Sequence, residues 1–134
     1  MKETLATAAK QAMTNAYAPY SGFCVGAALL CEDGSIYTGC NIENAGYSAT
    51  NCAERTAFFK AISDGKKSFT AIAVCGAKDG QLTDTVVSPC GVCRQVIREF
   101  CDDDFQIHLV TANAIKTMTL GELFPVSFGP DALI

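Results

Sequence analysis

The sequence predicts an α/β fold in which helices cover the faces of a sheet of about five strands. An apolar run over residues 23–31 precedes an Asp33-Gly34 turn and a second extended segment, which indicates a β-hairpin. Strand-like and helix-like segments then alternate along the chain, as they do in sheets with helices on their faces. The chain has 134 residues, 49% of them hydrophobic, which is enough for a single domain over residues 1–134 with a sizeable core.

The first half of the chain is expected to contain one helix before the hairpin and one after it. Alanine and larger apolar residues recur at three- and four-residue spacing over residues 3–16, which predicts a helix that Pro19 ends. The second strand of the hairpin runs over residues 36–41. A polar loop over residues 42–50 then leads directly into a helix from about residue 52 to residue 63.

The second half is expected to continue the alternation, with a strand at 69–76, a helix from Ser88 to about residue 101, strands at 105–111 and 115–118, and a short helix from Thr119. Ser88 and Pro89 are the residue types preferred at an N-cap and at the first helical position, which places the helix start there. Thr119 and Glu122 form a capping-box pattern. In the longer helix, four apolar residues are expected to face the core: Val92, Val96, Ile97 and Phe100.

The composition excludes several classes of partner. The formal net charge is −4 and no run of Lys or Arg is present, so polymeric nucleic acid is not an expected partner. No apolar stretch reaches the length of about 18 residues that a membrane span needs, so no membrane partner is expected. The segment from Met1 to Thr4 does not resemble a secretory signal. The eight cysteines are therefore expected to stay reduced, in a cytoplasmic protein.

Three of the cysteines lie in unusual surroundings. Cys52, Cys90 and Cys93 stand among polar residues, Gly and Pro at two expected helix starts. A helix N-terminus stabilises negative charge and lowers the pKa of a thiol, which favours the thiolates that bind zinc. A structural zinc has four protein ligands, whereas a catalytic zinc keeps three and leaves the fourth position to water. Three candidate ligands therefore predict a catalytic site. The other cysteines suit small buried side chains: Cys24, Cys31, Cys40, Cys75 and Cys101.

Glu54 follows Cys52 by two residues, in the first turn of the expected helix. Its carboxylate can lie beside the open side of the metal and carry protons between water and a substrate nitrogen. The plainer interpretation is a capping box with Asn51. Three thiolates outweigh the charge of Zn²⁺, so a positive group is expected to offset them. Arg55 is the candidate for this role, although a solvated surface position for Arg55 also stays open.

Several segments of the chain resemble the zinc-dependent cytidine deaminases. The central motifs are Cys52-Ala53-Glu54 and Pro89-Cys90-Gly91-Val92-Cys93. The resemblance extends over nearly the whole chain, through Ala18-Pro19-Tyr20-Ser21, Phe23-x-Val25-Gly26-Ala27-Ala28, Gly39-x-Asn41-Ile42-Glu43-Asn44, Asn51-Cys52-Ala53-Glu54-Arg55 and Phe128-Gly129-Pro130, where x is any residue. Position 52 holds cysteine rather than histidine, and in this the chain resembles the small, homotetrameric, three-cysteine branch of the family. The resemblance implies a three-layer α-β-α sandwich with a mixed sheet, and one Zn²⁺ per subunit.

The resemblance also implies a reaction in pyrimidine salvage, the hydrolysis of free cytidine and 2′-deoxycytidine to the corresponding uridines and ammonia. Zinc-activated water attacks C4 of the pyrimidine, while Glu54 moves protons to N3 and to the leaving amine. Asn41 and Glu43 are expected to bind the ribose. Phe23 is expected to pack against the nucleoside, and backbone amides near Ala53 to hold the base carbonyl.

In this family, active sites are completed across subunit interfaces. Phe128 is therefore expected to stack on the base in a neighbour's site, and Ala45 and Tyr47 to reach a neighbouring pocket of a homotetramer. Two other interpretations stay open. One is a structural zinc module without catalysis, in which His108 is the fourth ligand. The other is a deaminase of another amine-bearing heterocycle, such as an aminopyrimidine antibiotic, in which the ribose-binding residues do little.

Overall fold

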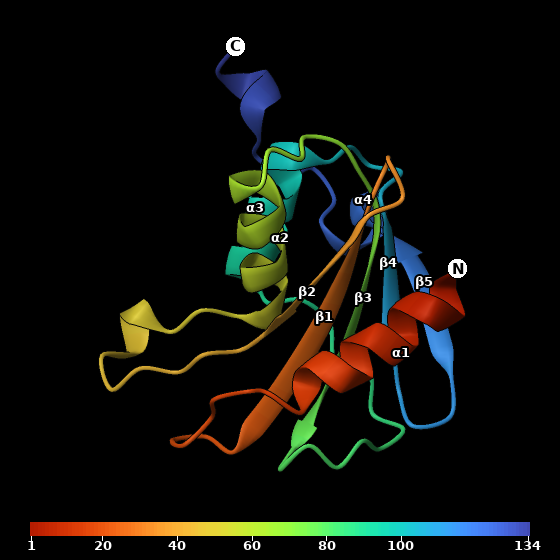
Figure 1. The fold of residues 1–134 in the computed structure, drawn as a ribbon. Coiled ribbons are helices and arrows are strands. Elements are labelled where there is room, and N and C mark those ends of the chain that lie inside the picture. Colours follow the sequence, from red (N-terminus) through yellow and green to blue (C-terminus); the bar gives the residue numbers. More distant parts are fainter.

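The sheet has five strands in the order β2-β1-β3-β4-β5 in the computed structural model, which describes all of residues 1–134 (Figure 1). Neighbouring strands β3 and β4 pair in parallel, and the other neighbouring pairs are antiparallel. The expected mixed sheet is therefore confirmed, with every expected strand present. The strands are β1 (Phe23–Cys31), β2 (Ile36–Cys40), β3 (Phe69–Lys78), β4 (Gln106–Val110) and β5 (Ile115–Thr119).

The directions of the strands bring the two cysteine-bearing segments together. β2 and β3 both pair antiparallel with β1, so their carboxyl ends lie at the same end of the sheet. After β2 the chain continues to α2 (Ala53–Ser63), and after β3 it continues to α3 (Gly91–Phe100). The chain therefore leaves the same end of the sheet before it enters α2 and before it enters α3. Open α/β sheets bind their ligands at this end.

Helices cover both faces of the sheet. α1 (Lys2–Met13) lies on one face, and α2 and α3 lie on the other, which gives the expected three layers (Figure 1). A short α4 (Leu120–Leu123) follows β5, and 3-10 turns span Tyr47–Ala49 and Pro130–Ala132. Both 3-10 turns extend away from the body of the domain (Figure 1). No helix is both long enough and apolar enough to cross a membrane.

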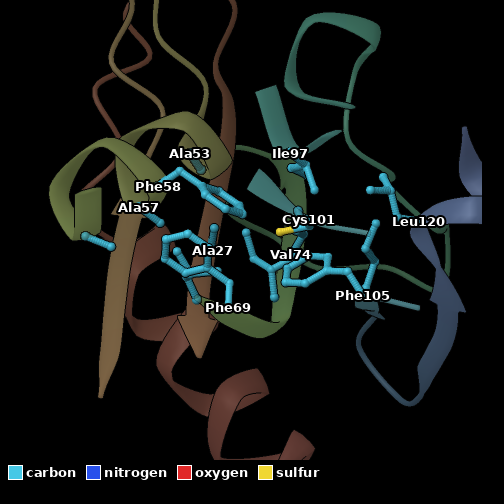
Figure 2. Close-up of a cluster of buried hydrophobic side chains, with 14 of the residues drawn as sticks. Ala27, Ala53, Ala57, Phe58, Phe69, Val74, Ile97, Cys101, Phe105 and Leu120 are labelled. Carbon is cyan, nitrogen blue, oxygen red and sulfur yellow. The ribbon is translucent and has the colours of Figure 1, made fainter. Parts of the chain in front are cut away.

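The main core lies between the sheet and helices α2 and α3. Alternate residues of β1, β3 and β4 contribute to it, and Figure 2 shows the rings of Phe58, Phe69 and Phe105 gathered together. The ring centroid of Phe58 lies 5.1 Å from that of Phe69 and 6.1 Å from that of Phe105. A smaller core lies under α1 on the opposite face. Burial of Phe58 fixes α2 against the sheet, and burial of Ile97 fixes α3.

Two glycines allow helices to approach the sheet closely. A Cβ on Gly26 of β1 would lie 2.0 Å from the carbonyl oxygen of Ala9 in α1. A Cβ on Gly39 of β2 would lie 2.4 Å from the carbonyl oxygen of Ala53 and 2.6 Å from the nitrogen of Ala57, both in α2. Gly39 therefore determines how closely the first turn of α2 packs on the sheet.

Two helix ends differ from the prediction. α1 ends at Met13 rather than at residue 16, because the next three N–H groups bond to carbonyls three residues back instead of four. α3 begins at Gly91, so the prediction of Ser88 as its N-cap is wrong; the N-cap is Cys90. Ser88 and Pro89 precede the helix, where they accept hydrogen bonds from the side chain of Arg94 in α3.

The buried face of α3 is narrower than predicted. Cys93 and Ile97, one turn apart, are fully buried and define the inner face. The prediction that Val92 faces the core is wrong, because Val92 is exposed. Phe100 faces the core only from its margin: it is 38% exposed, yet its ring stacks on the ring of Phe58 with centroids 6.2 Å apart. Val96 is half-buried. In contrast, the predicted capping box at the start of α4 is confirmed by reciprocal hydrogen bonds between Thr119 and Glu122.

Candidate zinc and catalytic site

The three cysteines predicted as metal ligands come together at the starts of α2 and α3. The Sγ atoms of Cys52, Cys90 and Cys93 all lie within 4.8 Å of one another, and those of Cys52 and Cys90 are 3.8 Å apart. Cys52 and Cys90 are the N-caps of the two helices, yet neither side chain makes a capping hydrogen bond. Both sulfur atoms are therefore available as ligands.

This donor set fits a zinc ion. Tetrahedral zinc with Zn–S distances of about 2.3 Å places its sulfur ligands about 3.8 Å apart. The observed separation of the Cys52 and Cys90 sulfur atoms, 3.8 Å, agrees with that geometry. No histidine or carboxylate joins the three cysteines in the cluster. Three thiolates with a fourth position left for water are the pattern of a catalytic zinc site.

Hydrogen bonds around the sulfur atoms favour a thiolate at Cys52. The Nη2 atom of Arg55 donates to the Sγ atom of Cys52 at 3.2 Å. Contacts with the Cys93 thiol and with Arg55 lower the pKa of Cys52 to about 5. The contact with Cys52 also raises the pKa of Cys93, because a second thiolate beside the first is disfavoured without a cation. Arg55 thus lies against a ligand sulfur, and its solvated surface position is excluded.

The five other cysteines have different surroundings. All eight thiols are unpaired; Cys31, Cys75 and Cys101 are buried, while Cys24 and Cys40 are half-buried. Burial raises the pKa of Cys75 to about 11 and that of Cys101 to about 12. Thiols held in this way stay protonated and behave as small apolar side chains, which separates them from the metal cluster.

Glu54 lies in the first turn of α2 and is only 4% exposed. Cys52 is the N-cap, and the Asn51 side chain donates to the hydroxyl of Thr56 at 3.0 Å, so the capping-box interpretation of Glu54 is wrong. Burial and the charge on Cys52 raise the pKa of Glu54 to about 7. A carboxyl group that titrates near neutral pH beside a metal site is suited to accept a proton and return it.

His108 lies on the opposite face of the sheet from the cysteines. Its neighbours in β4, Ile107 and Leu109, belong to the core under α2 and α3, so His108 faces the α1 side. The Nδ1 atom of His108 lies 2.8 Å from the hydroxyl of Thr117 in β5. This placement excludes His108 as the fourth ligand of a structural zinc site.

Asn41 follows β2 and is tied to the start of β1. It is 8% exposed; its Oδ1 atom accepts from the N–H of Val25 at 2.9 Å, and its Nδ2 atom donates to the carbonyl of Phe23 at 2.8 Å. One N–H of the amide group remains for a further acceptor. Phe23 begins β1 and is 37% exposed, on the same face as the α2 and α3 core. Ala53 is fully buried at the first position of α2.

Glu43 accepts three hydrogen bonds from one turn of chain. The donors are the backbone N–H groups of Tyr20, at 2.9 Å, and of Ser21, at 3.1 Å, together with the Ser21 hydroxyl. The hydroxyl contact lowers the pKa of Glu43, so this carboxylate is ionised at neutral pH. Glu43 lines an open hollow of about 410 Å³ with Tyr47, Thr50 and the two donor residues. The cysteines are not among the lining residues.

The residues predicted to reach neighbouring subunits lie on exposed segments. Ala45 is exposed, Tyr47 is 78% exposed and Phe128 is 60% exposed. The Tyr47 ring contacts the Tyr20 ring edge-on, with centroids 6.5 Å apart. The carbonyl of Phe128 accepts from the Nε2 atom of Gln95 in α3 at 2.9 Å. A single chain therefore leaves these aromatic rings largely in contact with solvent.

Two polar residues at these helix starts were not predicted from the sequence. The hydroxyl of Thr56 lies 3.1 Å from the carbonyl oxygens of Cys40 and Cys52, which links β2 to the N-cap of α2. Arg94 contacts the segment that precedes Cys90. Their one sequence signal is position, since each lies one helical turn after an N-cap cysteine.

Known proteins resemble this chain over nearly its full length. Residues 1–109 match the family described as "Cytidine and deoxycytidylate deaminase zinc-binding region". The chain belongs to this family. It is 53% identical over 132 residues to the cytidine deaminase of Sporosarcina psychrophila, and the alignment covers 98% of this chain and 93% of that relative. The predicted family and enzyme class, a zinc-dependent cytidine deaminase, are thereby confirmed.

Solved structures of the family share the fold of this deaminase. The crystal structure of cytidine deaminase from Burkholderia pseudomallei is 43% identical, with a TM-score of 0.87 and coverage of 96% of this chain and 99% of that one. This likeness confirms the predicted fold. A blasticidin-S deaminase from Bacillus cereus is 36% identical over 107 residues, with coverage of 78% of this chain and 76% of that relative.

Proposed function

We propose that this deaminase removes the amino group of free cytidine and 2′-deoxycytidine by hydrolysis of the C4–N bond, giving uridine, 2′-deoxyuridine and ammonia. The proposal is based mainly on the position of the buried carboxyl group of Glu54. It lies in the first turn of α2, directly after Cys52, which is one of the three clustered cysteines. The similarity to two proteins named cytidine deaminase supports the choice of a cytosine nucleoside. A net charge of −4 suits an uncharged nucleoside better than polymeric nucleic acid.

Cys52, Cys90 and Cys93 would hold one Zn²⁺ per subunit, which when bound makes water a nucleophile at neutral pH. Glu54, in its ionised form, accepts a proton from the water as the oxygen bonds to C4 of the base. Glu54 then delivers that proton to N3. The second proton of the water follows the same route to the amino nitrogen, the C4–N bond breaks, and ammonia leaves. Arg55 offsets the excess negative charge of the thiolates.

The ribose is proposed to bind between Asn41 and Glu43. The amide of Asn41 is oriented by its two bonds to β1 and keeps one N–H for a sugar hydroxyl. The ionised carboxylate of Glu43 is held by its three donors and can accept from a hydroxyl group. Phe23 is proposed to pack against the nucleoside. The N–H groups near Ala53, at the positive end of α2, are proposed to hold the base carbonyl.

A homotetramer with shared active sites is proposed as the working assembly. Tyr47 and Phe128 are large apolar side chains on segments that extend from the domain, so a partner surface is the natural place to bury them. Phe128 would stack on the base in a neighbour's site, and Ala45 and Tyr47 would contact a neighbouring pocket. The whole of residues 1–134 is proposed as one catalytic domain of a cytoplasmic enzyme in pyrimidine salvage. The eight unpaired cysteines agree with a reducing compartment.

A second candidate is the deamination of another amine-bearing heterocycle. The relative named blasticidin-S deaminase favours it, because that match also includes most of this chain. The two candidates differ in their use of the ribose. Asn41→Ala and Glu43→Ala should strongly raise KM for cytidine under the first candidate, and should change turnover of the other heterocycle little under the second.

The test is an ultraviolet assay that follows loss of the cytidine absorbance band, with zinc measured in the same sample. We expect loss of the band with cytidine and 2′-deoxycytidine, little loss with free cytosine, and close to one zinc per chain. Removal of zinc by a chelator should abolish the activity, and added zinc should restore it. A zinc-loaded protein that leaves both nucleosides unchanged would contradict the proposal.

A further inference from the structure

The segment that leads into Cys90 is held by very few hydrogen bonds. Residues 79–90 connect β3 to α3 without regular secondary structure. The middle of this connection is anchored, since the N–H of Ala112 donates to the carbonyl of Thr83 at 2.9 Å. From Val86 to Pro89, in contrast, the only hydrogen bonds are two that come from the side chain of Arg94.

Arg94 uses its whole guanidinium group in these contacts. Its Nε atom donates to the carbonyl of Pro89 at 2.7 Å, and its Nη2 atom donates to the hydroxyl of Ser88 at 2.9 Å. Its Nη1 atom donates to the carbonyl of Leu123, the last residue of α4. Long helical side chains point back toward the helix N-terminus, which explains how Arg94 reaches residues that precede its own helix. One side chain therefore joins the segment before Cys90 to α4.

Of the three ligands, Cys90 depends most on its backbone for its position. Cys93 is fully buried, and the Cys52 sulfur is contacted by Arg55. Cys90 is exposed, so packing of its own side chain does not fix it; the residue before it, Pro89, is fully buried. The Pro89 carbonyl belongs to the planar peptide group that Pro89 shares with Cys90. A hydrogen bond to that carbonyl restrains the rotation of the peptide plane, and with it the direction in which the Cys90 side chain leaves the backbone.

We propose that Arg94 is a positioning residue for the zinc site, which holds Cys90 in place for the metal through the carbonyl of Pro89 and the hydroxyl of Ser88. The proposal rests on the zinc assignment made above. Arg94 donates to no ligand sulfur and acts only through the backbone before Cys90. The planar fork of arginine matches three acceptors at once, which the single ammonium group of lysine does not.

Arg98 provides a matched control on the same helix. It lies one turn further along α3, and its guanidinium also contacts a carbonyl and a polar side chain, those of Cys101 at 3.4 Å and Asp103 at 2.5 Å. These partners lie after the C-terminal end of α3, away from the start of the helix. Arg94→Met and Arg98→Met thus remove similar groups from one helix, and only the first removes a contact with the segment before Cys90.

The experiment measures zinc affinity by competition with a chromophoric chelator, together with the melting temperature of each variant. We expect Arg94→Met to bind zinc about 10- to 100-fold more weakly than the wild type, as losses of outer contacts at metal sites do. Arg98→Met should bind zinc as the wild type does, even where its melting temperature falls equally. Arg94→Lys should bind zinc about 3- to 10-fold more weakly than the wild type. This variant tests the proposal if Arg94→Met does not fold.

Wild-type zinc affinity in Arg94→Met or in a folded Arg94→Lys would overturn the proposal, as would equal weakening by Arg98→Met. The proposed function is checked separately, by zinc content and cytidine turnover of the wild-type chain. A wild-type protein that binds zinc tightly but does not convert cytidine would contradict the function and leave the role of Arg94 standing.

Discussion

The two helix starts that form the metal site are held in place in different ways. The start of α2 follows a segment with backbone pairing, in which Ile42 and Asn51 exchange hydrogen bonds at 2.9 and 3.0 Å. Thr56 adds a link from α2 to β2, and Arg55 contacts the Cys52 sulfur. The start of α3 carries two ligands, yet the segment before Cys90 is bonded only by Arg94.

This difference indicates a division of roles between the two helices. α2 carries Glu54, the proposed proton-transfer residue, whose position relative to the substrate must be accurate to a fraction of an ångström. Several independent contacts hold α2, so the loss of one has a limited effect. α3 supplies two of the three sulfur atoms, and the segment before it has fewer hydrogen bonds, although Pro89 and Cys93 are fully buried. Mutations at the two starts should therefore differ in their effects on zinc binding.

Gly39→Ala should have the largest effect on the site among the packing changes. The new Cβ would lie 2.4 Å from the Ala53 carbonyl oxygen, and backbone atoms of a packed helix have little room to move. We expect a loss of about 1–3 kcal/mol in the free energy of unfolding, with zinc affinity reduced at least about tenfold. Gly26→Ala is the control, because its Cβ would displace α1 on the other face. It should destabilise the fold without weakening the zinc site. Equal zinc loss in both variants would contradict the account.

Thr56→Val should have a smaller effect. It removes the hydroxyl contacts with the carbonyls of Cys40 and Cys52 and with the side chain of Asn51. The expected cost is about 0.5–1.5 kcal/mol in the free energy of unfolding, measured with urea, because a part-buried hydroxyl loses its hydrogen bonds while the backbone N–H of residue 56 still donates to the Cys52 carbonyl. Zinc affinity should fall less than about threefold, since other contacts still hold α2. Thr56→Ser, which keeps the hydroxyl, should restore stability. If Thr56→Val weakened zinc binding more than Arg94→Met does, zinc binding would depend more on contacts at the start of α2 than on those at the start of α3, contrary to the proposal.

Gln95→Ala should affect substrate binding and not the metal. The variant loses the hydrogen bond that orients the Phe128 carbonyl, so the segment that carries the aromatic ring becomes less ordered. We expect KM for cytidine to rise about two- to tenfold, which corresponds to one hydrogen bond, with zinc affinity unchanged. Gln106→Ala, in an exposed glutamine of β4, is the control. An unchanged KM would remove the support for Phe128 as a substrate contact.

His108→Gln should leave the zinc site unchanged, because His108 lies on the other face of the sheet. Its effect should appear in the pH dependence of stability. Burial lowers the pKa of His108, so the unfolded chain takes up a proton first as the pH falls below about 6.5. The wild type should therefore lose stability below that pH more steeply than His108→Gln, when unfolding of zinc-free protein is compared at several pH values. Loss of zinc from the variant would restore the structural-site interpretation.

Much of the fold, and the three candidate zinc ligands, could be predicted from local sequence. The hairpin was predicted from the Asp33-Gly34 pair, where Gly34 has a φ of 90°, and the α4 start from the reciprocal pattern of Thr119 and Glu122. Cys52, Cys90 and Cys93 could be recognised because a cysteine that only fills the core rarely lies among Gly, Pro and polar residues. In each case the physical cause acts within a few residues, so a single sequence records it.

The features that could not be predicted depend on contacts that form only in the folded chain. The start of α3 was misplaced because residue preferences favoured Ser88 as the N-cap, whereas in the structure Ser88 and Pro89 contact the Arg94 side chain before the helix begins. Gly39 looks like any strand glycine until the backbone of α2 is placed over it. For the same reason, a capping role for Glu54 could not be excluded until Cys52 was identified as the N-cap. Side-chain reach and helix packing decide these points.

The most direct test of the central claim is the rate of cytidine hydrolysis by Glu54→Gln, with zinc measured in the same sample. We expect zinc content and melting temperature equal to those of the wild type, and a rate lower by about 10²- to 10⁴-fold, because the amide cannot carry the proton. Glu99→Gln, at an exposed acid of α3, should retain full activity. A zinc-loaded Glu54→Gln enzyme with near wild-type turnover would show that Glu54 does not carry the proton.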